Sequence, residues 1–268
     1  MTNNNKPIRC FDGNARPHEP FWRVRNAAET GAEPEIELYG VISEYSWLDD
    51  EITPQMFKQD LYNVGQGGPV TVRIDSPGGD VIAASVIRSI MSDYPGPITT
   101  RIDGLAASAA VIIAMAGQKV RIMDSAYMMI HDPAVVVFLA MLDIDTLDQL
   151  HTQLKAIKTG IVDTYANKTG LSAEKVSRLM ADETWMSARQ ALEYGFVTEI
   201  IEGGQKQAPA NGALKNVAYV NALKTYVNVP QALLSSEPVT ADDNETPAQS
   251  QVDEHEAQSL RDEIEVYL

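Results

Sequence analysis

The stretch Arg101-Ile-Asp-Gly-Leu-Ala-Ala-Ser-Ala-Ala-Val-Ile-Ile-Ala-Met-Ala-Gly117 decides the fold of this chain. Its first residues alternate as in a β-strand, a turn is expected at Gly104, and the apolar run after Ser108 predicts a buried helix that ends at Gly117. Backbone N–H groups at a helix start have no intrahelical partner, so a hydroxyl at this junction would have oxyanion donors beside it. The commoner alternative, on this stretch alone, is a small serine that fills a tight helix–sheet contact.

Strands and helices alternate along the chain on both sides of this stretch. Short alternating runs predict strands over 36–42, 70–75, 97–103, 119–123, 126–130 and 196–201, with one more edge strand over 21–25. Capping residues and apolar spacings of three and four predict helices over 54–65, 81–94, 143–168, 173–180 and 188–194, and a turn is expected over 76–80. This order predicts an α/β fold of repeated βαβ units around a mostly parallel sheet, with one long helical excursion.

Composition and charge exclude several classes of function. The chain of 268 residues has 21 Lys+Arg against 37 Asp+Glu, a net charge of −16, which argues against a nucleic-acid or anionic-membrane surface. The longest apolar run is too short to span a membrane, and the first residues lack the pattern of a secretory signal. A single cysteine, Cys10, allows no internal disulfide. We therefore expect a soluble protein of the cytoplasm.

The composition also divides the chain into four parts. Residues 1–34 are polar and proline-containing, which predicts a loosely ordered arm, and residues 35–202 carry the alternating elements of one globular domain. Residues 203–234 indicate a linker with short helical segments. Residues 235–268 are rich in acid, Ser, Thr, Pro and Gln, with Arg261 as the only Lys or Arg, and this composition predicts a mostly disordered acidic tail.

A possible acyl-transfer site can be assembled from the order of a few residues. Such chemistry needs a hydroxyl, a base to take its proton, a carboxylate to orient the base and donors for the oxyanion. Of four histidines, only His131 ends a predicted core strand, where function gathers in α/β folds. A histidine in that position is by itself more often structural. Ser108 precedes it, and two adjacent acids, Asp182 and Glu183, follow at the start of Asp-Glu-Thr-Trp.

The segment Ser76-Pro-Gly-Gly79 could supply the oxyanion donors, because glycines let backbone N–H groups approach a reacting carbonyl. A plain turn is the alternative reading. Neither phosphate-loop pattern occurs, and no His/Asp/Glu cluster has the spacing of metal ligands. We therefore expect no metal and no cofactor.

Four motifs together resemble the Clp protease proteolytic subunit family of ClpP-like serine peptidases. They occur in the family's order, as Asp75-Ser-Pro-Gly-Gly79, Gly104-Leu-Ala-Ala-Ser-Ala109, Met129-Ile-His-Asp-Pro133 and Ser187-Ala-Arg-Gln-Ala-Leu-Glu-Tyr-Gly-Phe196. Leu38-Tyr-Gly-Val-Ile, Glu-Thr-Trp and the acidic extension are most similar to the phage branch, the head maturation proteases. The resemblance implies a ClpP/crotonase-like fold over 35–202, with a protruding, handle-type helical region.

The resemblance also implies roles for single residues. Ser108 would be the nucleophile and His131 the general base, while Gly79 and Ala109 would donate the oxyanion-hole N–H groups. The family's triad aspartate lies two residues before an aromatic residue, which matches Glu183 here and leaves Asp182 as the alternative. A second departure follows His131, where Ala134-Val-Val-Val-Phe138 replaces the Gly-rich strand that pairs with substrate.

By this resemblance the protein is expected to be a serine endopeptidase that forms a ring-type homo-oligomer. In the phage reading it processes capsid or scaffold proteins in the cytoplasm of the bacterial host. The alternatives are a Clp-type degradation subunit that works with an ATPase partner, and an inactive assembly protein on the same fold. A hydratase or isomerase of the crotonase type is a further enzymatic alternative. The basic N-terminal loop that helps to dock an ATPase is not recognisable, so that partner is left open.

Overall fold

The computed structural model describes residues 24–25, 33–42, 54–135, 142–203, 217–230 and 233. The expected acidic tail and most of the expected N-terminal arm lie outside these residues. None of the helices in the described part of the chain is both long and apolar enough to cross a membrane.

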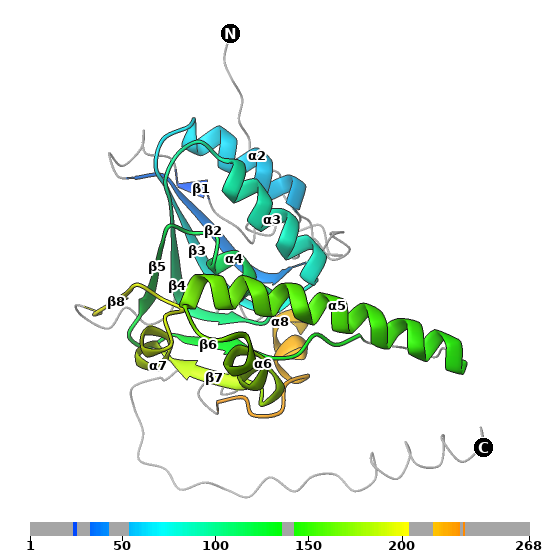
Figure 1. The fold of residues 1–268 in the computed structure, drawn as a ribbon. Helices are drawn as coiled ribbons and strands as arrows, with labels where there is room; N and C mark the ends of the chain where they lie inside the picture. The colour runs from blue at the N-terminus through cyan, green and yellow to red at the C-terminus, as the bar shows by residue number, and fades with distance from the viewer. Residues whose placement is uncertain are drawn as a thin grey trace, which may run out of the picture. The chain divides into compact units, whose positions relative to one another are not determined.

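One mixed sheet forms the centre of the fold (Figure 1). Its strands are β1 (Val24–Arg25), β2 (Glu35–Ile42), β3 (Val70–Gly79), β4 (Ile98–Ala107), β5 (Lys119–Met123), β6 (Tyr127–Ile130), β7 (Thr184–Ser187) and β8 (Glu199–Ile201). The helices are α2 (Pro54–Gly65), α3 (Val81–Asp93), α4 (Ala109–Ala114), α5 (Ile144–Thr169), α6 (Ala173–Ala181), α7 (Ala188–Glu193) and α8 (Val217–Leu223). Strands β2, β3, β4, β5 and β8 are parallel neighbours, which confirms the predicted α/β fold.

Strand β4 is the branch point of the sheet. Its first half pairs with β5 from Thr99 to Ile102, and its last three residues pair with β6 instead. Strand β7 continues this second branch by pairing antiparallel with β6. The branching brings the ends of β4 and β6 side by side, so the residues that follow these two strands meet at one edge of the sheet.

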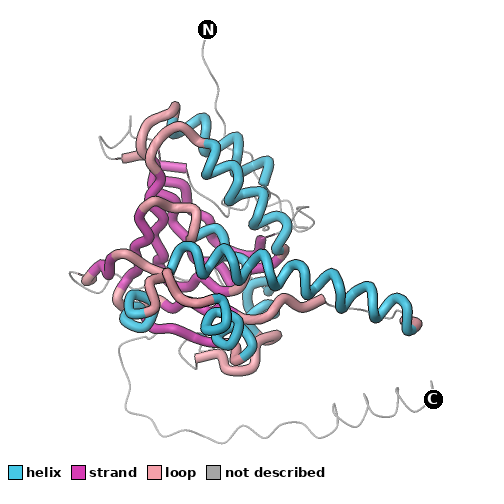
Figure 2. The backbone as a smooth tube through the Cα atoms, in the orientation of Figure 1, coloured by secondary structure: helices cyan, strands magenta, loops and turns pink. Residues whose placement is uncertain are grey.

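Helices cover the two faces of the sheet to different extents. Helices α2, α3, α4 and α5 lie on one side of the sheet (Figure 2). The main core lies under them, where residues such as Val72, Ile102 and Ile122 are fully buried. A smaller core lies on the opposite face, where Tyr219 and Leu223 of α8 pack against the ends of β4 and β6. The expected linker 203–234 therefore contains a helix that is packed on the sheet.

Helix α5 extends well beyond the sheet (Figure 1). Asp143 caps its start through the Thr146 N–H, and Gly170 ends it in the left-handed conformation. The C-terminal half is anchored by buried residues such as Tyr165, whereas Ile144 and Leu147 at its start are 77% and 51% exposed. This protruding helix agrees with the handle-type region that the family resemblance implies.

The sequence-based prediction is wrong at two turns and misses one strand. Strand β3 continues through the expected turn at 76–80, because Gly78 and Gly79 take positive φ angles and still pair with Val41 and Ile42. Strand β4 continues through Gly104 to Ala107, and the helix after Ser108 ends at Ala114 and not at the expected Gly117. Strand β7 covers the residues around Trp185, which were expected to lie between two helices.

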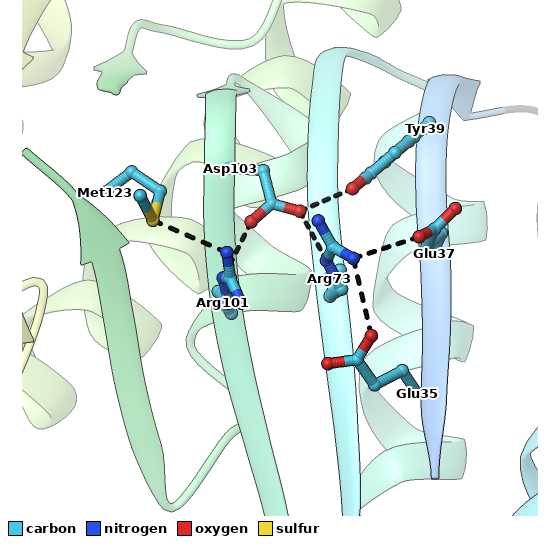
Figure 3. Close-up of polar contacts among 7 residues, drawn as sticks. All are labelled: Glu35, Glu37, Tyr39, Arg73, Arg101, Asp103 and Met123. Carbon is cyan, nitrogen blue, oxygen red and sulfur yellow. Dashed lines mark hydrogen bonds and ion pairs between the residues drawn. The ribbon is translucent and has the colours of Figure 1, made fainter. Parts of the chain in front are cut away.

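A charged network crosses the face of the sheet that carries α8 (Figure 3). Arg73 on β3 bonds Asp103 on β4 at 2.6 Å and Glu37 on β2 at 3.1 Å, and its side chain is only 15% exposed. Burial alone would lower the pKa of Arg73, but its interactions with Asp103, Tyr39 and Glu37 together outweigh burial and raise that pKa above its ordinary value. Tyr39 donates a 2.5 Å hydrogen bond to the same Asp103 carboxylate. The network ties three neighbouring strands together.

Candidate active site

Ser108 occupies the junction between β4 and α4, in a strained backbone conformation. Its φ and ψ angles are 53° and −121°, which are rare for a residue with a side chain. Its N–H donates a 2.8 Å hydrogen bond to the Met129 carbonyl of β6, and the six residues of α4 behind it are all buried. A sharp strand-to-helix turn of this kind presents a hydroxyl at the sheet edge and keeps its backbone fixed.

His131 follows β6 directly and meets this hydroxyl. Its Nε2 atom lies 2.7 Å from Ser108 Oγ. Burial lowers the pKa of His131 below its ordinary value of 6.5, although the charges of Glu183 and Asp132 oppose this shift. The imidazole is therefore neutral near pH 7 and able to accept the proton of the hydroxyl.

Of the two candidate acids, Glu183 is the one beside the histidine. The last pair in the antiparallel β6–β7 ladder is Ile130 with Thr184. His131 directly follows Ile130 and Glu183 directly precedes Thr184, so the two residues lie opposite each other just beyond this pair. Glu183 takes a φ of 47°, and its charge acts on the imidazole. Asp182 caps the end of α6 and is exposed. The geometry favours Glu183 over Asp182.

The Glu183 carboxylate is held by donors other than the imidazole. Its Oε1 atom accepts hydrogen bonds from the backbone N–H groups of Val227 at 2.8 Å and Asn228 at 3.0 Å, and from the Trp185 indole at 3.2 Å. Among the described residues, no hydrogen bond within 3.5 Å joins Glu183 to His131 or uses its Oε2 atom. The structure thus brings the serine and histidine into contact and places the acid beside them.

Gly78, and not Gly79, is the glycine that lies against the serine. A Cβ atom placed on Gly78 would be 2.8 Å from Ser108 Cβ and 3.2 Å from the Ala109 N atom. A Cβ atom on Gly79 would instead meet the backbone of Ile42, its partner in the sheet. The Gly78 N–H donates to Ser76 Oγ at 3.1 Å. Ala109 is the first residue of α4, where the N–H has no intrahelical acceptor.

Tyr226, which the sequence analysis did not single out, also belongs to the site. It follows α8, and its hydroxyl donates a 2.6 Å hydrogen bond to the Pro77 carbonyl. Its ring meets the His131 imidazole edge-on, with 5.2 Å between the ring centres. Burial raises the pKa of Tyr226 to about 12, although the neighbouring Ser108 side chain acts in the opposite direction. No local pattern could have indicated this contact, because Tyr226 and His131 are 95 positions apart.

A cavity of about 710 Å³ opens between α5 and α6. It begins at Asp132 and Pro133, and Lys158 on its wall bonds the Asp132 carboxylate at 2.7 Å. Within the described ranges, no group of three or more His, Cys, Asp or Glu side chains could hold a metal ion. The chemistry that the Ser108 hydroxyl and the His131 imidazole offer is acyl transfer.

Comparison with known proteins places most of the chain in a family. Residues 38–204 match the family model described as Clp protease. The ATP-dependent Clp protease proteolytic subunit 2 of Treponema pallidum is 32% identical over 172 residues, covering 63% of this chain and 82% of that protein. Proteolytic subunit 1 of Chlamydia trachomatis is 30% identical over 153 residues, covering 56% of this chain and 78% of that protein.

A solved structure shares the fold. A point mutant of ClpP1 from Listeria monocytogenes superposes with a TM-score of 0.55 at 25% sequence identity. The match covers 63% of this chain and 92% of the Listeria chain. The family match ends at residue 204, so α8 and Tyr226 lie outside it.

Proposed function

Because this chain belongs to the Clp protease family, we propose that it is a serine endopeptidase whose nucleophile is Ser108 and whose general base is His131. The 2.7 Å contact between Ser108 Oγ and His131 Nε2 carries this proposal. A hydroxyl this close to a neutral imidazole can transfer its proton as it attacks a carbonyl. The strained backbone conformation of Ser108 positions the hydroxyl at the sheet edge before a substrate binds.

In the proposed reaction, Ser108 Oγ attacks the carbonyl carbon of the scissile peptide bond while His131 Nε2 takes the hydroxyl proton. The tetrahedral intermediate collapses when His131 returns that proton to the departing amine, which leaves an acyl-enzyme. Water then hydrolyses the ester with the imidazole as base again. Glu183 is the proposed carboxylate of the triad, since its negative charge favours the imidazolium that forms in both steps.

Backbone N–H groups are the proposed donors to the oxyanion. The first is the N–H of Ala109 at the start of α4. The second comes from the Gly78–Gly79 segment, in which Gly79 is the donor that the family resemblance implies and Gly78 is the glycine that lies against Ser108. For Gly78 to serve, its N–H must exchange Ser76 Oγ for the substrate oxygen.

The protein is proposed to assemble into a ring-type homo-oligomer through the exposed start of α5. Ile144 and Leu147 are large apolar side chains that are 77% and 51% exposed on this protruding helix. Exposed apolar residues gathered on one element are typical of an interface. A second copy of the chain is the proposed partner, as in the ring assemblies of the family.

At a finer level, the proposed substrates are capsid or scaffold proteins processed during phage head maturation. This proposal rests on the motifs Leu38-Tyr-Gly-Val-Ile and Glu183-Thr-Trp and on the acidic extension after residue 235. The names of the relatives, ATP-dependent proteolytic subunits, favour a second candidate, a degradation subunit that works with an ATPase.

Co-expression with capsid and scaffold proteins separates the two candidates. If the protein is a head maturation protease, the wild type, but not Ser108→Ala, should cleave these proteins at discrete positions without an ATPase. Mass spectrometry of the products measures this. The second expects cleavage of unfolded proteins only when a Clp ATPase and ATP are added. Activity on neither kind of substrate would leave the fold as an assembly protein and refute both.

A further inference from the structure

We propose that the segment Tyr226–Asn228 is a positioning element of the active site, which orients Glu183 and supports His131. The inference rests on the proposed serine-peptidase function and adds a part to it. The segment lies outside residues 38–204, the part of the chain that matches the family. It nevertheless contacts the proposed acid and base directly.

The first observation is the set of hydrogen bonds on Glu183. The N–H groups of Val227 and Asn228 both donate to Oε1, and the Trp185 indole donates to the same atom. A carboxylate oxygen that accepts hydrogen bonds from two backbone donors is held in one orientation. Because Oε1 is fully used, Oε2 is the oxygen that the segment leaves for the imidazole of His131.

The second observation is the packing of the Tyr226 ring against His131. Its ring stands edge-on to the His131 imidazole at 5.2 Å and to the Trp185 indole at 6.1 Å. Its hydroxyl is tied to the Pro77 carbonyl, immediately before the two glycines of the proposed oxyanion region. Tyr226 therefore links the base to the strand end that faces the nucleophile.

The third observation is the way in which the segment is anchored. Helix α8, directly before it, buries Tyr219 and Leu223 against Leu105, Ala107 and Met129, which are residues of β4 and β6. Tyr219 also donates a 3.2 Å hydrogen bond to Asp75. Ser108 and His131 follow β4 and β6, and α8 packs on these same two strands. The Tyr226–Asn228 segment is therefore held in a fixed position relative to the residues that it supports.

The experiment compares two substitutions at Val227 in the full-length chain. Val227→Pro removes the N–H that donates to Glu183, while Val227→Ala keeps it and trims a side chain that is 83% exposed. Turnover of p-nitrophenyl butyrate, a small acyl substrate, is measured together with the rate at which a fluorophosphonate labels Ser108. We expect Val227→Pro to lower kcat by about 10²-fold with little change in KM, and Val227→Ala to match the wild type.

A second pair at Tyr226 keeps the test decisive if Val227→Pro does not fold, which circular dichroism would reveal. Tyr226→Ala removes the ring beside His131 and should lower kcat by about 10-fold or more, whereas Tyr226→Phe keeps the ring and should restore most of it. Unchanged turnover in folded Val227→Pro or Tyr226→Ala overturns the inference. Faster labelling in either variant also overturns it, because the segment would then block the site. If wild-type Ser108 is not labelled at all, the proposed function has failed instead.

Discussion

The backbone N–H of Val227 donates a 2.8 Å hydrogen bond to Oε1 of Glu183. The two residues are 44 positions apart, and Val227 lies outside the part of the chain that matches the Clp protease family. Glu183 stands opposite His131 at the end of the β6–β7 ladder, so the contact ties a C-terminal segment to the proposed catalytic residues. It also shows that the acid beside His131 is oriented by backbone donors.

Replacing the acid tests its role separately from that of its neighbour. Glu183→Gln should lower kcat/KM by about 10³-fold, because the imidazolium loses the carboxylate that stabilises it. The Glu183 charge raises the pKa of His131, so its removal should lower that pKa further and move the acid limb of the pH–rate profile to lower pH. Asp182→Asn, which changes the exposed alternative acid, should leave both quantities as in the wild type. The opposite ranking of the two variants would make Asp182 the acid.

A Cβ atom at Gly78 should damage the site and the fold together. Gly78 has a φ of 99°, and the added carbon of Gly78→Ala would lie 2.7 Å from the Ala107 carbonyl oxygen and 2.8 Å from Ser108 Cβ. We expect a loss of about 2 kcal/mol in the free energy of unfolding, with turnover at least about 10-fold lower. Urea denaturation and p-nitrophenyl butyrate turnover measure the two effects.

Gly160→Ala is the matched control, because a Cβ atom there meets nothing within 4 Å in the middle of α5. It should stabilise the protein by about 0.5–1 kcal/mol, since alanine favours a helix. A Gly78→Ala variant as stable and active as the wild type would remove Gly78 from the proposed site.

Removing the buried cation of the charged network should destabilise the protein more than removing an exposed one. Arg73→Ala leaves Glu37 and Asp103 without their shared cation in a region where the Arg73 side chain is 15% exposed. We expect it to cost about 3 kcal/mol in the free energy of unfolding, measured by urea denaturation. Arg121→Ala breaks an ion pair with Glu199 in which the side chains are 36% and 52% exposed, and it should cost less than about 1 kcal/mol. Equal costs would mean that burial does not decide the effect.

The exposed start of α5 can be tested through the oligomeric state. Replacing Ile144 and Leu147 together with Asp puts two charges on the proposed interface and should dissociate the ring, which light scattering after gel filtration would measure. Leu192→Asp makes the same kind of change on α7, at a residue that is 40% exposed, and should leave the assembly intact. A wild type that runs as a monomer, or a double variant that still forms the ring, would contradict the proposed interface.

Local patterns were sufficient to predict most of the fold. Alternating apolar residues and helix caps identify the parallel strands and α5, because these elements bury one face and cap their own ends. The continuation of β3 and β4 could not be predicted from local patterns. Gly78 and Gly79 of β3 remain paired with β2, and β4 continues past Gly104 because its last three residues pair with β6. The short strand β7 exists through its pairing with β6, which leaves little trace in its own sequence.

The candidate site divides in the same way. Ser108 and His131 lie in motifs at strand ends, and the ends of neighbouring parallel strands meet at one edge of a sheet, so their contact could be predicted from the sequence. Which of the two glycines lies against Ser108 could not be predicted, because it depends on a register shift between β2 and β3. Tyr226 and Val227 come to the site only because α8 folds back onto the sheet.

The central claim is that Ser108 is a nucleophile activated by His131. The most direct test treats the full-length wild type, Ser108→Ala and His131→Ala with a fluorophosphonate and locates the adduct by mass spectrometry. We predict one adduct on Ser108 in the wild type, none in Ser108→Ala, and labelling slowed by about 10³-fold in His131→Ala. An adduct that persists in Ser108→Ala, or labelling of Ser108 at an unchanged rate without His131, would contradict the account.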